Sequence, residues 1–144
     1  MDQVWGATIL ILGLISWLGQ TVSWFAPGLA VKLGVTEAES DVETAFWADT
    51  RGEAAWDFLT GWTLSLAGLL LVIDNSAWPY LGLVGGGMYL YYGGRGVFTR
   101  RAMQQRGLRV GSPESLRLAY VFLPLWALAG LVTIIAAIIE LESQ

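Results

Sequence analysis

The chain has 144 residues, of which 55% are hydrophobic and only 14% charged, with eight Lys and Arg against twelve Asp and Glu. Soluble domains carry about 25% charged residues, so this composition indicates a membrane protein. The sequence has no Cys and no His, which excludes disulfides, thiolate-held metal sites and histidine-ligated haem, and its net charge of −4 argues against a nucleic-acid partner.

Four long stretches contain no Asp, Glu, Lys or Arg: residues 3–31, 58–73, 75–94 and 118–139. A helix needs about 20 residues to cross about 30 Å of hydrocarbon, so three of the stretches suffice and the second is short. The apolar runs are continuous and not alternating, which excludes membrane-spanning strands. We therefore predict an all-α integral membrane protein, a single-domain bundle of four transmembrane helices. The predicted spans are residues 4–24, 52–73, 78–98 and 118–141.

The connection after the first span begins with "FAPG", where Pro27 cannot continue the helix. Two consecutive capping-box patterns follow, Thr36 with Glu39 and Ser40 with Glu43. They predict a short interfacial helix over about 37–48, with its apolar side toward the membrane. Farther along, "DNSAWP" predicts a tight turn between the second and third spans, and Ser112–Pro113–Glu114 predicts the start of the last helix.

All eight cations lie in or near the two long connections, residues 25–51 and 99–117. They are Lys32, Arg51, Arg95, Arg100, Arg101, Arg106, Arg109 and Arg117. The positive-inside rule places both connections in the cytoplasm and both termini outside it. The small size and the clean charge asymmetry indicate a bacterial inner membrane.

Four aromatic residues lie deep in the predicted spans: Trp17, Trp62, Tyr89 and Trp126. They could fill the core of the bundle, face lipid, or line a cavity for an apolar ligand, and the sequence leaves these readings open.

Glycines crowd the third span, "GLVGGGMYLYYGGRG". Gly82 and Gly86 form a GxxxG pair, and Gly87 and Gly94 lie a heptad apart. Such residues let helix backbones approach closely inside lipid, so we predict that these four pack against a helix of this chain or of another subunit.

Three carboxylates form a stripe at the start of the second span, because Asp49, Glu53 and Asp57 are spaced four residues apart. The uncharged stretch 58–73 covers only about 24 Å at the helical rise, so insertion draws Asp57 and Glu53 toward the hydrocarbon. Carboxylates at that depth need a partner, and Arg95 on the third span is at a comparable depth.

Other arginines are alternatives for that role: Arg51, Arg100, Arg101 and Arg117. The cluster of Asp49, Arg51, Glu53, Asp57 and Arg95 either ties the helices together or closes the cytoplasmic end of a ligand pocket. No nucleophile or metal-ligand set accompanies it, so we assign no catalytic residue and no metal.

The segments "WFAPGLAVKLGV" and "DTRGEAAWD" resemble the layout of DoxX-like small bacterial membrane proteins. Those are four-helix proteins of this length, and some are subunits of quinone-linked oxidoreductases. The resemblance implies a membrane accessory or quinone-proximal role around Arg51, Glu53 and Asp57. Since the chain lacks Cys and His, it offers no evident redox ligand of its own.

Three functions remain open at this point. The first is a non-enzymatic accessory or scaffold subunit, without a cofactor except for a lipid, quinone or other apolar molecule held between helices. Its partners would be membrane lipids and another membrane protein or a second copy. The second is an oligomeric channel or transporter that uses the inner-leaflet carboxylates. The third is a lipid-modifying enzyme that uses Glu53 and Asp57 with Arg95.

Overall fold

The computed structural model describes residues 2–143, and within that range its regular elements are helices, apart from one isolated bridge between Val42 and Val110. The elements in chain order are α1 (Asp2–Phe25), α2 (Pro27–Lys32), the 3₁₀ turn η1 (Glu39–Asp41), α3 (Thr44–Thr60), α4 (Trp62–Val72), α5 (Trp78–Gln105) and α6 (Pro113–Ser143). The predicted all-helical fold is therefore confirmed.

Three helical segments in the described part of the chain are long and apolar enough to cross a membrane: Gln3–Phe25, Thr44–Val72 and Pro113–Ser143. They correspond to α1, to α3 with α4, and to α6. The outward faces of these helices are apolar, as expected for contact with lipid; Ile11 and Val121, for example, are 57% and 58% exposed. Helix α5 has 28 residues but is rich in Gly and Tyr, which contribute little hydropathy, and it is not one of the three.

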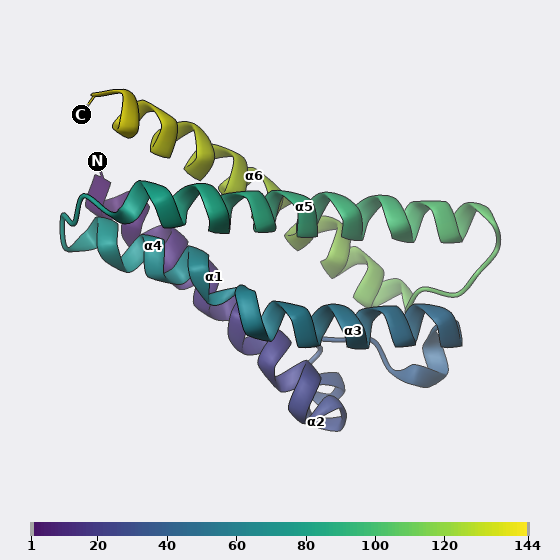
Figure 1. Cartoon of the computed structure of the whole chain (residues 1–144). Helices are drawn as coiled ribbons and strands as arrows, with labels where there is room; N and C mark the ends of the chain where they lie inside the picture. The colour runs from purple at the N-terminus through teal and green to yellow at the C-terminus, as the bar shows by residue number, and fades with distance from the viewer. Residues whose placement is uncertain (1, 144) are drawn as a thin grey trace.

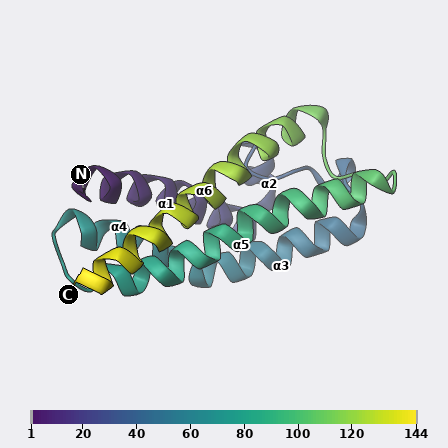
Figure 2. The same cartoon turned by 90° about the horizontal axis from the view of Figure 1, so that it is seen from above.

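The two ends of the bundle differ. Figures 1 and 2 show the beginning of α1, the end of α6 and the α4–α5 turn together at one end. We call this the terminal end. The start of α3 and the α5–α6 connection lie at the opposite end, and most of the Lys and Arg residues belong to the part of the chain around them. We call this the basic end.

Glycines bring the helices together in the half of the bundle nearer the terminal end. A Cβ added at Gly68 of α4 would lie 2.6 Å from the carbonyl oxygen of Gly6 in α1. One added at Gly85 of α5 would lie 2.6 Å from the backbone nitrogen of Leu64 in α4. One added at Gly130 of α6 would lie 2.5 Å from the carbonyl oxygen of Gly86 in α5. Each contact is between backbones, which explains how these helices pack tightly without large side chains between them.

The segment formed by α3 and α4 is interrupted at Gly61, and side chains from other helices bind the carbonyl groups there. The indole of Trp17 donates a hydrogen bond to the carbonyl of Phe58 at 2.9 Å. The buried hydroxyl of Tyr89 lies 3.2 Å from the Gly61 carbonyl and 3.1 Å from the Gly13 carbonyl. Backbone groups freed inside a membrane need such partners, so these bonds allow a helix break in the middle of the bundle.

We expect the Tyr89→Phe substitution to lower the free energy of unfolding by about 1–2 kcal/mol, because it removes the donor that joins α5 to α1 and to the break at Gly61. Denaturant titration of the purified protein in mild detergent measures this. Tyr91→Phe is the matched control, since Tyr91 is 69% exposed on the same helix. Equal stability of the two variants would show that the Tyr89 hydroxyl contributes nothing.

The predicted interfacial helix over 37–48 is wrong. Residues 37–43 contain only the short turn η1, residues 44–48 belong to α3, and Val42 pairs with Val110 of the α5–α6 connection. The backbone N–H of Glu43 donates to the carbonyl of Arg109 at 2.9 Å, and α3 begins directly afterwards at Thr44. Pairing of Val42 with the α5–α6 connection therefore outweighs the local helix propensity. Helix α3 starts at Thr44, eight residues before the predicted second span of 52–73.

The side chain of Val42 explains why this pairing is favourable. Val42, Phe46 and Val110 form a buried cluster at the basic end, each no more than 3% exposed. Neither expected capping box forms a side-chain cap, and in the second one Glu43 bonds to Arg109 instead. The last helix begins at Pro113, as predicted.

Candidate functional site

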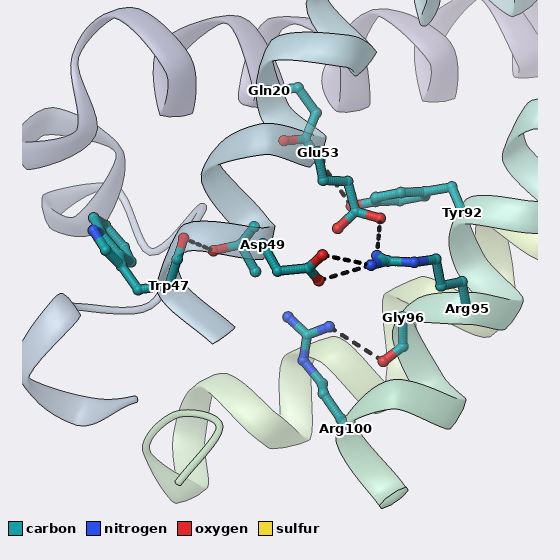
Figure 3. Close-up of polar contacts among 9 residues, drawn as sticks. Gln20, Trp47, Asp49, Glu53, Tyr92, Arg95, Gly96 and Arg100 are labelled. Atoms are coloured by element: carbon teal, nitrogen blue, oxygen red, sulfur yellow. Dashed lines mark hydrogen bonds and ion pairs between the residues drawn. The ribbon is translucent and has the colours of Figure 1, made fainter. Parts of the chain in front are cut away.

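The stripe of carboxylates on α3 meets Arg95 of α5 toward the basic end (Figure 3). One guanidinium nitrogen of Arg95 donates to both carboxylate oxygens of Asp49 at 2.7 Å, and the other donates to Glu53 at 2.7 Å. Asp49 and Glu53 are one helical turn apart, so a single planar guanidinium reaches both. Arg95 thus links α3 to α5 at a level where the two helices stand apart.

Arg51, which the sequence analysis included in this cluster, lies elsewhere. Its guanidinium donates to the carbonyl groups of Ser23 and Trp24 at the end of α1 and stacks 5.0 Å from the centre of the Trp24 ring. The last carbonyls of a helix have no partner within the helix and attract cations. Arg51 therefore caps α1 and fixes it to α3.

A cleft of ≈480 Å³ opens between α3 and α5 beside the Arg95 cluster. Asp49, Glu53 and Asp57 line one wall, and the other wall is formed by Arg95 with Tyr91 and Tyr92. We call this space the α3–α5 cleft. The carboxylate of Asp57, unlike its two neighbours, has no hydrogen bond or ion pair with any residue that the structure describes.

A second cavity, of ≈190 Å³, lies between α1, α5 and α6. Its wall is mostly apolar and includes Ile15 of α1 and Leu118, Phe122 and Trp126 of α6. We call this space the α1–α6 cavity. Polar groups face it from the inner side, among them Ser16 and Gln20 of α1 and Tyr92 of α5.

Tyr92 lines both spaces and separates them. The side-chain amide of Gln20 donates to the Tyr92 hydroxyl oxygen at 3.0 Å, and Figure 3 shows this pair above the Arg95 cluster. The hydroxyl hydrogen of Tyr92 is therefore available to another acceptor.

A buried ion pair closes the α1–α6 cavity at the basic end. Glu37, on the loop before η1, accepts a hydrogen bond of 2.7 Å from Arg100 of α5, and their side chains are only 8% and 12% exposed. Arg100 also donates to the carbonyl of Gly96 at 3.2 Å and lies 5.1 Å from the centre of the Phe46 ring. Arg100 was predicted only as an alternative partner of the α3 carboxylates, and Glu37 was not predicted as its partner, because no spacing in the sequence relates the two residues.

Comparison with protein-family models, with curated proteins and with solved structures finds no match to this chain. Within residues 2–143, no three Asp or Glu side chains are grouped so that they could hold a metal ion.

The aromatic residues proposed as cavity lining have different positions. Trp126 lines the α1–α6 cavity, and its indole donates to the Leu12 carbonyl at 3.2 Å. Trp17 and Tyr89 bind backbone carbonyls near Gly61. Trp62 is 40% exposed and bonds to the carbonyl of the nearby Leu59.

The four glycines proposed for packing divide into two pairs. Gly82 faces Trp78 and Ala137, and Gly86 faces the backbone of Gly130 in α6. An added Cβ at Gly87 or at Gly94 would meet no other atom within 4 Å, so these two glycines lie on the open face of α5.

Proposed function

We propose that this chain is a non-enzymatic membrane protein of four spanning helices, an accessory subunit that holds a lipid, a quinone or another apolar molecule in the α1–α6 cavity. The observation that carries the proposal is this cavity, whose mostly apolar lining also includes the polar side chains of Ser16, Gln20 and Tyr92. The resemblance to DoxX-like proteins points in the same direction.

The fourth span in this proposal is α5. Its 28 residues would reach about 42 Å at the helical rise, which is more than a bilayer core requires. It packs against α4 on one side and α6 on the other, which buries Gly85, Gly86 and Tyr89, whereas Tyr91 on its open face is 69% exposed. With α5 counted, the positive-inside rule places the basic end in the cytoplasm and both termini outside, as for a bacterial inner-membrane protein.

The α1–α6 cavity has the properties of a small-ligand site. An engineered apolar cavity of about 150 Å³ binds benzene, so ≈190 Å³ accommodates one ring or a short stretch of acyl chain. Its rim is continuous with the lipid-facing surface, because Ile15 and Phe122 are 57% and 43% exposed. A ligand can thus enter from the bilayer, and the Tyr92 hydroxyl can donate to a carbonyl oxygen of a quinone or a lipid ester.

The test is to purify the protein in mild detergent and to identify bound small molecules by native mass spectrometry and solvent extraction. We expect one lipid or quinone per chain in the wild type and its loss in Ala119→Trp, which fills the cavity from α6. Leu128→Trp, on the lipid-facing side of α6 at 57% exposure, is the control and should retain the ligand. A wild-type protein without a stoichiometric ligand, or equal retention by both variants, would refute the proposal.

A further inference from the structure

We propose that the α3–α5 cleft is a separate binding site for the ammonium headgroup of an alkylammonium amphiphile. The net negative charge of the residues that line the cleft favours a positively charged ligand. Three carboxylates, Asp49, Glu53 and Asp57, face the cleft against the single guanidinium of Arg95. The lining therefore has a formal charge of −2, since Arg95 is the one Lys or Arg among the described residues that line the cleft.

The hydrogen bonds of Arg95 argue against an anionic ligand. Both of its terminal nitrogens already donate to Asp49 and Glu53 at 2.7 Å. An anion could reach only the remaining guanidinium hydrogens and would face the repulsion of all three carboxylates. The carboxylate of Asp57 is in a different situation, since it forms no hydrogen bond or ion pair with a described residue and borders the same space. It can accept hydrogen bonds from a ligand or balance a positive charge.

Aromatic residues flank Asp57 on both helices. Trp56 lies beside it on α3, and Tyr91 and Tyr92 face it from α5. Ammonium groups are attracted to aromatic faces, and sites for quaternary ammonium ligands combine such faces with nearby carboxylates. A bare metal ion needs several converging oxygen ligands, and the described acidic residues do not form such a group. An organic cation is the class of ligand that uses both the carboxylate and the rings.

The polarity of the cleft changes along its length, and this indicates an amphiphile. Asp49, Glu53 and Arg95 lie nearer the basic end, whereas Met88 lies about two turns deeper along α5 than Arg95. The mouth is open to the surroundings, because Trp56 and Tyr91 are 63% and 69% exposed. The headgroup would lie between Asp57 and the aromatic rings, and the alkyl chain would continue past Met88 into the bilayer.

This site does not depend on the proposed function, because the pair of Gln20 and Tyr92 separates the cleft from the α1–α6 cavity. The Ala119→Trp variant fills that cavity and should leave the α3–α5 cleft unchanged. Loss of the lipid or quinone without loss of ammonium binding, or the reverse, would thus identify which of the two proposals fails.

The experiment measures binding of dodecyltrimethylammonium, below its micelle concentration, to the full-length protein in nanodiscs of phosphatidylcholine. Dodecanol, with the same chain and no charge, is the reference ligand. We expect the ammonium compound to bind about tenfold more tightly than dodecanol, and Asp57→Asn to remove that difference. Glu114→Gln, an exposed acid at the start of α6, is the control and should bind like the wild type.

Trp56→Ala provides a second variant if Asp57→Asn folds poorly. Its side chain is mostly exposed, so the fold should tolerate the change while the preference for ammonium falls several-fold, as expected when one aromatic face is lost. Equal affinity of the wild type for dodecyltrimethylammonium and dodecanol would overturn the proposal. So would an unchanged preference in both variants.

A further arm distinguishes two sources of the headgroup. In nanodiscs that contain phosphatidylethanolamine and phosphatidylglycerol, selective retention of phosphatidylethanolamine in native mass spectra would support the proposal with a membrane lipid as ligand. Binding of dodecyltrimethylammonium without such retention would support it with a free organic cation as ligand.

Discussion

Substitution of Gly85 by alanine is expected to lower the free energy of unfolding by about 2 kcal/mol or more, although it adds a single methyl group. The new Cβ would lie 2.6 Å from the backbone nitrogen of Leu64 and 2.7 Å from its Cα. Both are backbone atoms of α4, so no side-chain rotation can make room, and α4 and α5 must separate. That separation would also disturb the contacts of Tyr89 and Leu64 in the nearby buried cluster.

Gly87→Ala, two residues along the same helix, is the matched control with an effect of opposite sign. Its Cβ would meet no atom within 4 Å. Alanine favours the helical state over glycine by about 0.5–1 kcal/mol, so this variant should be as stable as the wild type or slightly more stable. Denaturant titration of both variants in the same detergent gives the comparison. If Gly85→Ala is as stable as Gly87→Ala, the tight approach of α4 and α5 is wrong.

The glycines also show what the sequence could not determine. The GxxxG spacing of Gly82 and Gly86 and the heptad spacing of Gly87 and Gly94 are equally regular in the sequence. In the structure the heptad pair that faces α6 is Gly86 with Gly93, one position earlier. When several glycines are adjacent, the sequence does not show which of them face the neighbouring helix. A shift of one residue turns the buried face of the helix by about 100°. Only the neighbouring helices determine which glycines are inside.

The distribution of charged residues along the sequence predicted where the helices lie, but it did not predict the path of the connections between them. Uncharged stretches predicted α1, α4, α5 and α6 because burial of a charge in lipid is costly everywhere. The path of residues 33–43 depends instead on Val42 packing against Val110, which is distant in the sequence and carries no local signal.

The difference between helices and connections also explains why the Arg95–Glu53 ion pair was predicted and the Glu37–Arg100 pair was not. The sequence placed Arg95 at the depth of Glu53 because both lie on long helices, where depth follows from residue number, and the structure has them in contact. Glu37 lies on the irregular connection, whose path was not predictable, and its partner Arg100 was not identified.

Removal of one partner of the Glu37–Arg100 pair is expected to be among the most destabilising changes in the molecule. The two side chains are 8% and 12% exposed, and a charge left alone in such a place costs about 3–5 kcal/mol. We therefore expect Arg100→Met to lower the free energy of unfolding by about 3 kcal/mol, with Glu37 left without its cation. Glu37→Leu should have a similar effect through the unpaired Arg100.

The double variant distinguishes a buried ion pair from ordinary packing. If Arg100→Met and Glu37→Leu are combined, neither charge remains unpaired, so the loss should be clearly smaller than the sum of the two single losses. Arg101→Met is the control, because Arg101 is an exposed neighbour on α5 and should change stability by less than about 0.5 kcal/mol. Strictly additive single effects would mean that the two side chains stabilise the loop independently. A large coupling would instead make this pair the contact that fastens the connection between α1 and α3 to α5, and so closes the α1–α6 cavity at the basic end.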